Sequence, residues 1–293
     1  MTSSQQMIET ASKCRTIMEA DALESIGGFI MSRQAPDGGF MGKSEASDLY
    51  YTVFAIEALA SLGWKIPVEA LERYLARFGT GNGLDLPHLS CLARVAARLA
   101  GGEPAGRKEI AARLEQYRSR DGGYAQVPGT DQGEAYACFL AGIAYEDLGL
   151  SIPKQLKALR SITRLELPSG GYAGSGASGV AATTTTASAA VIRAVIHLPV
   201  SKKTTEWLLN RYDPSGGGFR ATEEAPLPDL LSTATALFAL SRLMIPLDSV
   251  RQGCANFVQS LWDDNGGFRG HAADSVPDCE YTFYALLALG CLG

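Results

Sequence analysis

The chain has 293 residues and a formal net charge of −5, and no basic run in it is longer than two residues, as at Lys202-Lys203, so nothing in it would attract a nucleic-acid backbone. Apolar residues make up 46% of the chain and charged residues 19%, which excludes a disordered protein. No uncharged stretch approaches the roughly eighteen apolar residues that a membrane span needs. We therefore expect a folded protein without nucleic-acid partners or transmembrane segments.

The first twenty residues contain Glu9, Lys13 and Arg15 and no continuous apolar core. This pattern predicts an amphipathic helix and not a signal peptide. The six cysteines are scattered without C-x-x-C spacing, which is typical of reduced thiols that serve as small apolar side chains. Both features predict a cytoplasmic protein.

One sequence motif, a Gly-Gly pair followed by an aromatic residue, recurs along the chain. Its aromatic residues are Phe40, Tyr124, Tyr172, Phe219 and Phe268. The last four are 47 to 49 residues apart, and the first interval is about twice as long. The Gly-rich stretch 79–84 supplies the missing member. The repeat therefore predicts six units within a single domain that covers residues 1–293.

Each unit is expected to begin with an amphipathic helix. The predicted ranges are 21–33, 67–78, 107–118, 153–165, 202–212 and 249–262. In the third, Ile110, Leu114 and Tyr117 recur at helical spacing, while charged residues take the opposite face. These helices would form an outer layer.

The second helix of each unit is nearly uncharged around its circumference, as in 183–195 and 233–243. A helix without a polar face has no solvent face. Six such helices, each backed by an amphipathic one, predict an all-α (α/α)6 toroid with six inner and six outer helices and no strands. The glycine pairs are expected to supply positive φ at the turns, and the aromatic residues to fill the space beside them.

Acidic residues stand at the expected starts of the inner helices. They are Asp48, Asp131, Asp229 and Asp278, with Glu134 and Glu280 within one turn. An N-cap role explains a residue type that recurs at one place in the repeat. The alternative is that one or two of them act as acid, base or Mg²⁺ ligand over an apolar cavity, where burial would raise their pKa.

Histidine and cysteine offer weaker signals. His88, His197 and His271 lack metal-ligand spacing, so a metal or catalytic role is not expected for them. Cys279 follows Asp278 at a predicted helix start, where the helix dipole would lower the pKa of a thiol, but a small buried residue is the simpler interpretation.

The repeat resembles that of the αα-toroid proteins, namely the β subunits of protein farnesyl- and geranylgeranyltransferases and the barrel domains of squalene–hopene-type cyclases. The resemblance covers essentially the whole chain. It is greatest to geranylgeranyltransferase β subunits, through Pro228-Asp229 and through Asp278, Thr282 and Leu289-Gly290. The resemblance implies an isoprenoid or other apolar small molecule as the ligand.

The chain departs from both chemical signatures of these families. The three zinc ligands of the transferases correspond to Asp229, Leu231 and Tyr281, and neither leucine nor tyrosine suits zinc, so zinc is not expected. The basic residues that bind the lipid diphosphate would fall near Glu223 and Pro226. In the cyclases, Leu231 takes the place of the proton-donating central Asp.

Two functions remain open. The first is a prenyltransferase- or terpene-cyclase-like enzyme that acts on an isoprenoid or similar lipid without the zinc triad or the cyclase motif. Its catalytic candidates are Asp229, Asp278, Glu280 and Tyr281, and Mg²⁺ is its candidate cofactor. The second is a non-catalytic scaffold of the same fold that binds a lipid or a protein partner.

The register of the resembling families also implies which residues face the lumen and contact the ligand. They are Tyr51, Phe54, Tyr136, Leu231, Thr235, Tyr284 and Ala288. The expected lumen has a volume on the order of several hundred Å³. Aromatic rings at these positions would either form part of the core or line the pocket.

Overall fold

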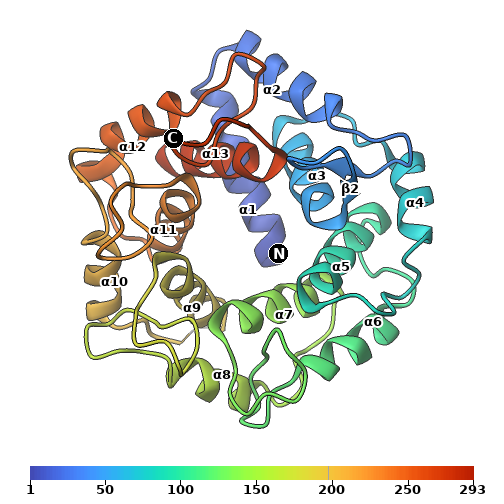
Figure 1. The fold of residues 1–293 in the computed structure, drawn as a ribbon, viewed down its shortest axis with the longest axis vertical. Helices are drawn as coiled ribbons and strands as arrows, with labels where there is room; N and C mark the ends of the chain where they lie inside the picture. The colour runs from blue at the N-terminus through green and yellow to red at the C-terminus, as the bar shows by residue number, and fades with distance from the viewer. Residues whose placement is uncertain (197) are drawn as a thin grey trace.

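The computed structural model describes residues 1–196 and 198–293, and twelve of the helices in these ranges form two concentric rings (Figure 1). The outer ring consists of α2 (Ala20–Ser32), α4 (Val68–Ala76), α6 (Arg107–Leu114), α8 (Gln155–Thr163), α10 (Lys202–Leu209) and α12 (Asp248–Ser260). The inner ring consists of α3 (Leu49–Leu62), α5 (Leu86–Ala100), α7 (Ala135–Asp147), α9 (Thr183–Val195), α11 (Leu230–Arg242) and α13 (Cys279–Leu292). The predicted (α/α)6 toroid is confirmed.

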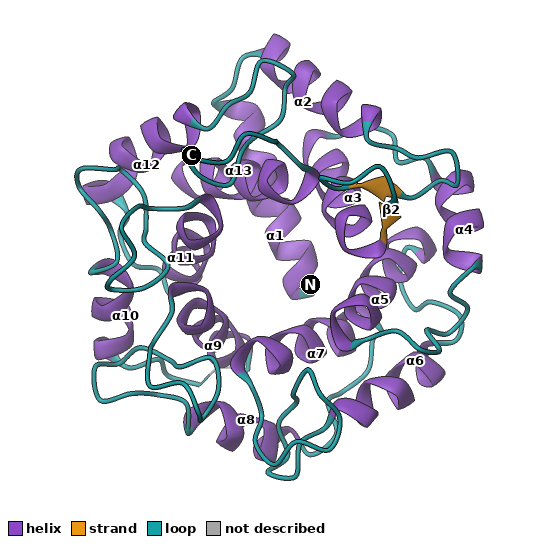
Figure 2. Cartoon of the chain, viewed as in Figure 1, coloured by secondary structure: helices purple, strands orange, loops and turns teal. Residues whose placement is uncertain are grey.

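The two rings differ in composition as the sequence predicted. In the outer helix α6, only Ile110, Ala111 and Leu114 are buried. The inner helix α11 buries residues on most of its surface, including the polar Ser232 and Thr233. The outer helices surround the inner ring (Figure 2). Inner helices therefore bury residues on most of their surface, whereas outer helices keep a charged face in solvent.

Each glycine pair forms the turn between the outer and the inner helix of a unit, and this turn packs on the outer helix of the next unit. The first glycine of a pair has positive φ, for example +98° at Gly38 and +91° at Gly266. A Cβ at Gly38 would lie 2.1 Å from the carbonyl oxygen of Ala70 in α4, and a Cβ at Gly266 would lie 2.3 Å from that of Ser25 in α2. The turn after α12 thus packs on α2 and closes the ring, because only glycine permits both the conformation and the close approach.

The aromatic residue after each pair is buried, and its backbone bonds to the following inner helix. The amide of Phe219 donates to the hydroxyl of Thr233 at 2.9 Å, and the amide of Phe268 donates to that of Thr282 at 3.1 Å. Likewise, the amide of Tyr172 donates to the hydroxyl of Thr186 at 2.9 Å. These threonines stabilise the turn, so their recurrence has a structural cause.

A short strand pair lies beside the first inner helix. Strand β1 (Phe40–Met41) pairs antiparallel with β2 (Ser47–Asp48). The expectation of no strands is wrong here, because the chain after the turn runs back along the segment that leads into α3. None of the helices in residues 1–196 and 198–293 is long and apolar enough to cross a bilayer.

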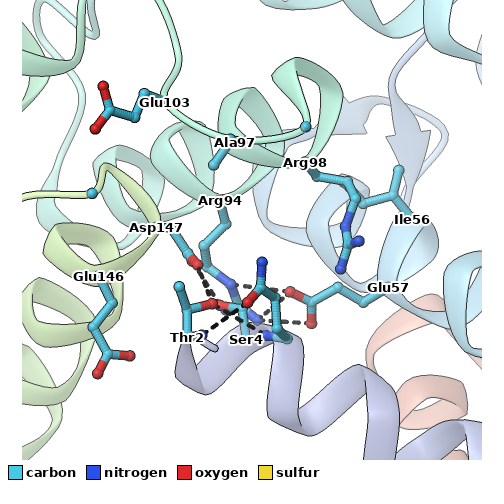
Figure 3. A pocket seen from close by; sticks show the side chains of 14 residues that line it. Thr2, Ser4, Ile56, Glu57, Arg94, Ala97, Arg98, Glu103, Glu146 and Asp147 are labelled. Atoms are coloured by element: carbon cyan, nitrogen blue, oxygen red, sulfur yellow. Dashed lines mark hydrogen bonds and ion pairs between the residues drawn. The ribbon is translucent and has the colours of Figure 1, made fainter.

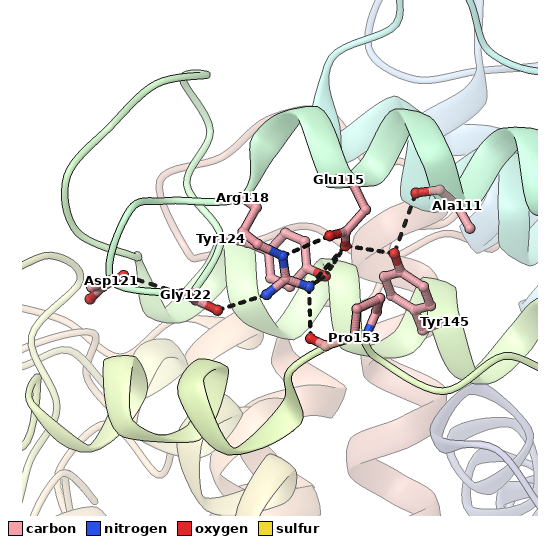
Figure 4. A network of polar contacts seen from close by, with 9 residues as sticks. Ala111, Glu115, Arg118, Asp121, Gly122, Tyr124, Tyr145 and Pro153 are labelled. Atoms are coloured by element: carbon pink, nitrogen blue, oxygen red, sulfur yellow. Dashed lines mark hydrogen bonds and ion pairs between the residues drawn. The ribbon is translucent and has the colours of Figure 1, made fainter.

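A partly buried polar network attaches the short helix η2 (Glu115–Tyr117) to the inner ring (Figure 4). The carboxylate of Glu115 accepts hydrogen bonds from the hydroxyls of Tyr124 and Tyr145, both at 2.7 Å, and from the Arg118 guanidinium. These hydrogen bonds outweigh burial and hold the pKa of Glu115 below its ordinary value. The network therefore stabilises the junction of outer and inner rings around α7.

The first helix, α1 (Ser3–Ser12), does not belong to either ring. It crosses the ring at the end where the inner helices finish, and the N-terminus lies near the centre of the view (Figure 1). A Cβ at Gly290, near the end of α13, would lie 2.0 Å from the Thr10 carbonyl oxygen, so the two helices touch through backbone. The predicted N-terminal amphipathic helix is present, followed by the 3-10 turn η1 (Lys13–Thr16).

Candidate functional site

The lumen is the space enclosed by the six inner helices. We call its end at the starts of these helices the mouth, and the end covered by α1 the floor. A cavity of about 50 Å³ lies inside it, between the rings of Phe54, Phe139, Phe238, Phe283 and Tyr284. This cavity is smaller than the several hundred Å³ that the sequence predicted for the lumen.

Three of the inner-helix acids are N-caps. The carboxylates of Asp48, Asp229 and Asp278 accept the amides of the first turns of α3, α11 and α13. Asp131 does not stand at a helix start: α7 begins after Glu134, and Asp131 forms an exposed ion pair with Arg120 at 2.8 Å. The capping interpretation therefore accounts for these three residues.

Two carboxyl groups gather at the first turn of α13 with perturbed acidity. Asp278 is fully buried, and burial raises its pKa to about 6. Burial likewise raises the pKa of Glu280, which is 9% exposed, to about 7. The Oδ2 atom of Asp278 is buried without a hydrogen-bond partner. Both acids can therefore carry a proton near neutral pH.

Tyr50 connects these acids to the lumen. Its hydroxyl donates to Glu280 Oε1 at 2.6 Å, and its ring lies edge-on to that of Phe54 with centroids 5.0 Å apart. Phe54 and Tyr284, whose centroids are 5.4 Å apart, both line the cavity. Glu280 and Tyr284 are one helical turn apart on α13, so the acid lies about 6 Å along the helix from the cavity wall.

A glycine packs directly against the ring of each tyrosine that flanks the acids. A Cβ at Gly270 would lie 2.5 Å from the Tyr281 ring, and a Cβ at Gly42 would lie 2.1 Å from the Tyr51 ring. Lys43 lies over Tyr281, 5.3 Å from the ring centroid. Tyr281 and Tyr51 thus form part of the mouth beside Asp278, and burial raises the pKa of Tyr51 to about 12.

The loops above the acids carry one ion pair that spans the closure of the ring. Lys43 Nζ lies 2.5 Å from Asp274 Oδ2, which joins the loop before α3 to the loop before α13. The positive charge of Lys43 acts against the burial that raises the pKa of Asp278 and Glu280. The acid cluster therefore lies at the seam between the first and the last unit.

The other predicted site residues are dispersed. Phe54, Thr235 and Tyr284 line the cavity, whereas Tyr51, Tyr136, Leu231 and Ala288 are not among its lining residues. Ala288 is fully buried, and Tyr136 is 37% exposed. Asp229 caps the neighbouring helix α11, and burial raises its pKa. The structure thus brings together Asp278, Glu280 and Tyr281 from the predicted catalytic set and places Asp229 one inner helix away.

The sequence analysis missed the contacts of His88 and one buried ion pair. His88 Nδ1 lies 2.6 Å from Asp85 and Nε2 lies 3.2 Å from Asp48, and these contacts raise the pKa of His88 to about 9. At the floor, Arg94 and Glu57 form a buried ion pair at 2.7 Å. The sequence signal for this pair is a single acidic residue, Glu57, on one nearly uncharged inner helix and a basic residue, Arg94, on the next.

A polar pocket lies beyond this ion pair, outside the lumen. It has a volume of about 330 Å³ and is bounded by the ends of α3, α5 and α7 and the start of α1 (Figure 3). Figure 3 shows Thr2 and Ser4 against Asp147, and Arg94 against Glu57. Arg94 also lines the lumen cavity, so its side chain separates the two spaces.

The zinc positions of the resembling transferases do not fit zinc in this chain. Both carboxylate oxygens of Asp229 accept bonds of 2.7 Å from Ser232, and Leu231 has no donor atom. Within the ranges that the structure describes, no group of three or more His, Cys, Asp or Glu side chains is arranged to hold a metal ion.

The cysteines and histidines show one departure from expectation. Burial raises the pKa of the Cys279 thiol, because desolvation outweighs the helix N-terminus that was expected to lower it. His271 lies in the exposed loop before α13. His197 lies outside the described residues. All six cysteines are unpaired.

The model of one protein family matches almost the whole chain. It is the prenyltransferase alpha-alpha toroid domain, and it matches residues 2–247 and 244–293. No curated protein sequence matches the chain.

Several solved structures share the fold. The type II terpene cyclase MstE from Scytonema, in complex with geranylgeranyl dihydroxybenzoate, has a TM-score of 0.69 at 14% identity, with 97% of each chain covered. A protein from Actinoplanes has a TM-score of 0.65 at 16% identity, over 94% of this chain and 98% of that one. Candida albicans protein geranylgeranyltransferase-I with GGPP has a TM-score of 0.51 at 16% identity, over 92% and 77%. At these identities the likeness shows the fold alone.

Proposed function

Since the chain belongs to the prenyltransferase alpha-alpha toroid domain family, we propose that it is an enzyme that binds an isoprenoid or similar apolar lipid in the lumen and protonates it at the mouth. The family and the fold support an isoprenoid-related function. One solved protein of this fold holds geranylgeranyl dihydroxybenzoate, and another holds GGPP.

One observation carries the catalytic part of the proposal. Asp278 and Glu280 are two buried acids with raised pKa values, and they converge beside the aromatic wall of the lumen. A group that keeps its proton near pH 7 can act as a general acid. We assign that role to Glu280, with Tyr50 orienting its carboxyl group by the hydrogen bond at 2.6 Å.

The aromatic rings give the site a means to stabilise positive charge. Protonation of an oxygen or a double bond leaves a cation on the lipid. Tyr284 lies one helical turn from the acid on α13, and its ring lies 5.4 Å from that of Phe54, so both π faces are available to the cation. Asp278 would hold the second proton of the pair. Mg²⁺ stays a candidate ligand of these carboxylates once both are ionised.

A second function is favoured by the size of the cavity. A space of about 50 Å³ is smaller than an engineered cavity of roughly 150 Å³ that holds benzene. A lumen filled by its own side chains suits a non-catalytic scaffold that binds a protein partner.

Mass spectrometry distinguishes the two functions. Purified protein is incubated with neutral prenyl alcohols and their diphosphates, and products are measured together with any lipid that co-purifies. The enzyme proposal expects a new isoprenoid product that Glu280→Gln abolishes and the exposed-loop control Glu224→Gln retains. No product from any substrate, together with no lipid bound, would favour the scaffold.

A further inference from the structure

Arg211 lies just after the outer helix α10, and its guanidinium is buried without a good acceptor. The residue is 9% exposed, and its guanidinium lies over the Trp207 ring, 4.8 Å from the centroid. Among the described residues, its Nε atom has no hydrogen-bond partner. Glu223 Oε2 lies 3.7 Å from Nη1, which is too far for a hydrogen bond. A buried cation without an acceptor costs free energy, and an added anion would relieve that cost.

The repeat offers an internal comparison, because Arg33 takes the same position in the first unit. The carbonyl oxygen of Arg33 accepts from the amide of Met41, and that of Arg211 accepts from the amide of Arg220, both at 2.9 Å. Both arginines have a buried Nε without a partner, so they differ in the Nη atoms. Arg33 Nη2 donates to the carbonyl oxygen of Gly42 in the loop that follows. The loop after Arg211 brings a carboxylate to this place instead.

Arg211 lines two pockets at the outer ring, beside α10 (Figure 1). Their volumes are about 270 and 280 Å³, and neither shares a lining residue with the lumen cavity. In the second pocket, Arg220 is already paired with Asp213 at 3.1 Å, so it adds no free charge. The polar side chains around Arg211 in the two pockets include Ser169, Lys203, Asn210 and Thr222. This lining predicts a polar ligand.

The charges of the first pocket indicate the class of that ligand. Its lining carries two cations, Lys203 and Arg211, and two carboxylates, Glu206 and Glu223. The Glu223 side chain is 81% exposed, and an exposed ion pair of this kind is weak. When Glu223 turns into solvent, one net positive charge remains, together with a planar guanidinium that suits a carboxylate. A dianionic phosphate would exceed this charge by one unit.

From this arrangement we propose that Arg211 is the centre of a second binding site, which takes a small polar monocarboxylate in place of the Glu223 side chain. The carboxylate accepts from the guanidinium edge, while Trp207 covers one guanidinium face. Lys203 and Asn210 supply further donors in the same pocket. The carboxylate belongs either to a free small acid or to the end of a peptide chain. The site is independent of lipid binding in the lumen.

The site is tested on the full chain by NMR titration with N-acetylglycine at pH 7 and constant ionic strength. The indole and arginine Nε–H signals are followed, and Arg211→Lys identifies the signal of Arg211. N-acetylglycine should shift this signal to saturation, and the neutral N-acetylglycinamide should not. Glu223→Gln should tighten binding by about fivefold, because it removes the competing carboxylate. Glu224→Gln makes the same change on the next residue and should leave the dissociation constant unchanged.

A second pair of variants tests the guanidinium itself. Arg211→Lys keeps the charge but loses the planar group, so it should abolish the shift of the indole signals. Arg33→Lys makes the same change at the equivalent position of the first unit and should leave binding unchanged. Thermal melting first shows that each variant is folded. If Arg211→Lys is not folded, the exposed pair Glu223→Gln and Glu224→Gln carries the test.

Each outcome decides one claim. No saturable shift in either the wild-type protein or Glu223→Gln overturns the site, and so does unreduced affinity in Arg211→Lys. Equal affinities of Glu223→Gln and Glu224→Gln overturn the displacement of Glu223. Tighter binding of inorganic phosphate than of N-acetylglycine overturns the carboxylate assignment. A hexapeptide with a free C-terminus that binds about tenfold tighter than N-acetylglycine assigns the site to a peptide end, and equal binding assigns it to a free acid.

Discussion

The Tyr50 hydroxyl donates a 2.6 Å hydrogen bond to the Glu280 carboxylate and so joins the first inner helix to the last. Burial nevertheless dominates the acidity of Glu280, whose pKa lies at about 7 instead of 4.5. A carboxyl group with a raised pKa in the folded state favours folding most below pH 4.5, and this contribution is lost as the pH rises through 7. Glu280 therefore costs stability at the pH where it would act as an acid.

The first prediction concerns this cost. Glu280→Gln should raise the free energy of unfolding at pH 8 by about 1–3 kcal/mol, because it removes a buried charge and keeps an acceptor for Tyr50. At pH 4 the difference from wild type should vanish, since Glu280 is then protonated. Chemical denaturation at both pH values measures this, with Glu224→Gln as the exposed control. Equal stability of Glu280→Gln and wild type at pH 8 would contradict the raised pKa.

The second prediction concerns the closure of the ring. Gly266→Ala should lower the free energy of unfolding by about 1–3 kcal/mol, because φ is +91° and a Cβ would meet Ser25. Gly267→Val should also destabilise, but through contact with the Phe29 ring at 2.6 Å and not through φ, which is positive only in the first glycine of the pair. Gly28→Ala faces open space in α2 and should stabilise instead. Thermal melts that rank the three variants differently would argue against this turn.

The third prediction concerns His88. Its pKa is raised to about 9, first by the hydrogen bond to Asp48, so its contribution to stability is complete below pH 6.5 and is lost as the pH rises through 9. His88→Ala should lower the melting temperature at pH 6 and have little effect at pH 10. The exposed His271→Ala is the matched control. A melting difference that stays constant from pH 6 to pH 10 would show that the ion pairs of His88 do not stabilise the mouth.

The fourth prediction concerns zinc. Purified protein dialysed against metal-free buffer should contain no stoichiometric zinc by elemental mass spectrometry, because Leu231 offers no donor and Ser232 occupies both oxygens of Asp229. About one equivalent of zinc that survives dialysis and disappears in Asp229→Ala would refute this. Changing Asp131, an exposed acid of the same end of the toroid, provides the control.

The fold could be predicted because every unit contains the same pair of helices and the same kind of turn. A helix with no polar face must be surrounded by other helices, so the inner position of 183–195 follows from its own sequence. A glycine pair before such a helix must turn the chain, so the role of Gly266 follows from its place in the repeat. The position of α1 could not be predicted. Its pattern shows that one face is apolar but not which surface covers that face, and Gly290 gives no sign of the contact with Thr10.

The candidate site also has one part that the sequence predicts and another that it does not. Asp278, Glu280 and Tyr281 are neighbours in sequence, so a single helix start brings them together. Tyr50 and Lys43 approach them only when the ring closes, over a separation of more than 200 residues. The lumen volume depends on how rings from six helices interlock, and no residue pattern contains that information.

The last prediction concerns the charge of the ligand. The mouth holds Asp229, Asp278 and Glu280, and Lys43, the cation that acts on Asp278 and Glu280, is already paired with Asp274 at 2.5 Å. A diphosphate would therefore meet carboxylates without a free basic partner, whereas a neutral prenyl alcohol buries its chain at ~0.8 kcal/mol per CH₂ group without that repulsion. In metal-free buffer, the alcohol should raise the melting temperature more than the diphosphate of equal chain length, and Mg²⁺ should narrow the gap by bridging the charges. Thr235→Trp, which fills the cavity from α11, should abolish the shift, and Val68→Trp on the outer ring should not. A larger shift with the diphosphate in the absence of Mg²⁺ would mean that a basic group other than Lys43 receives it, and an unchanged shift in Thr235→Trp would place the lipid outside the lumen.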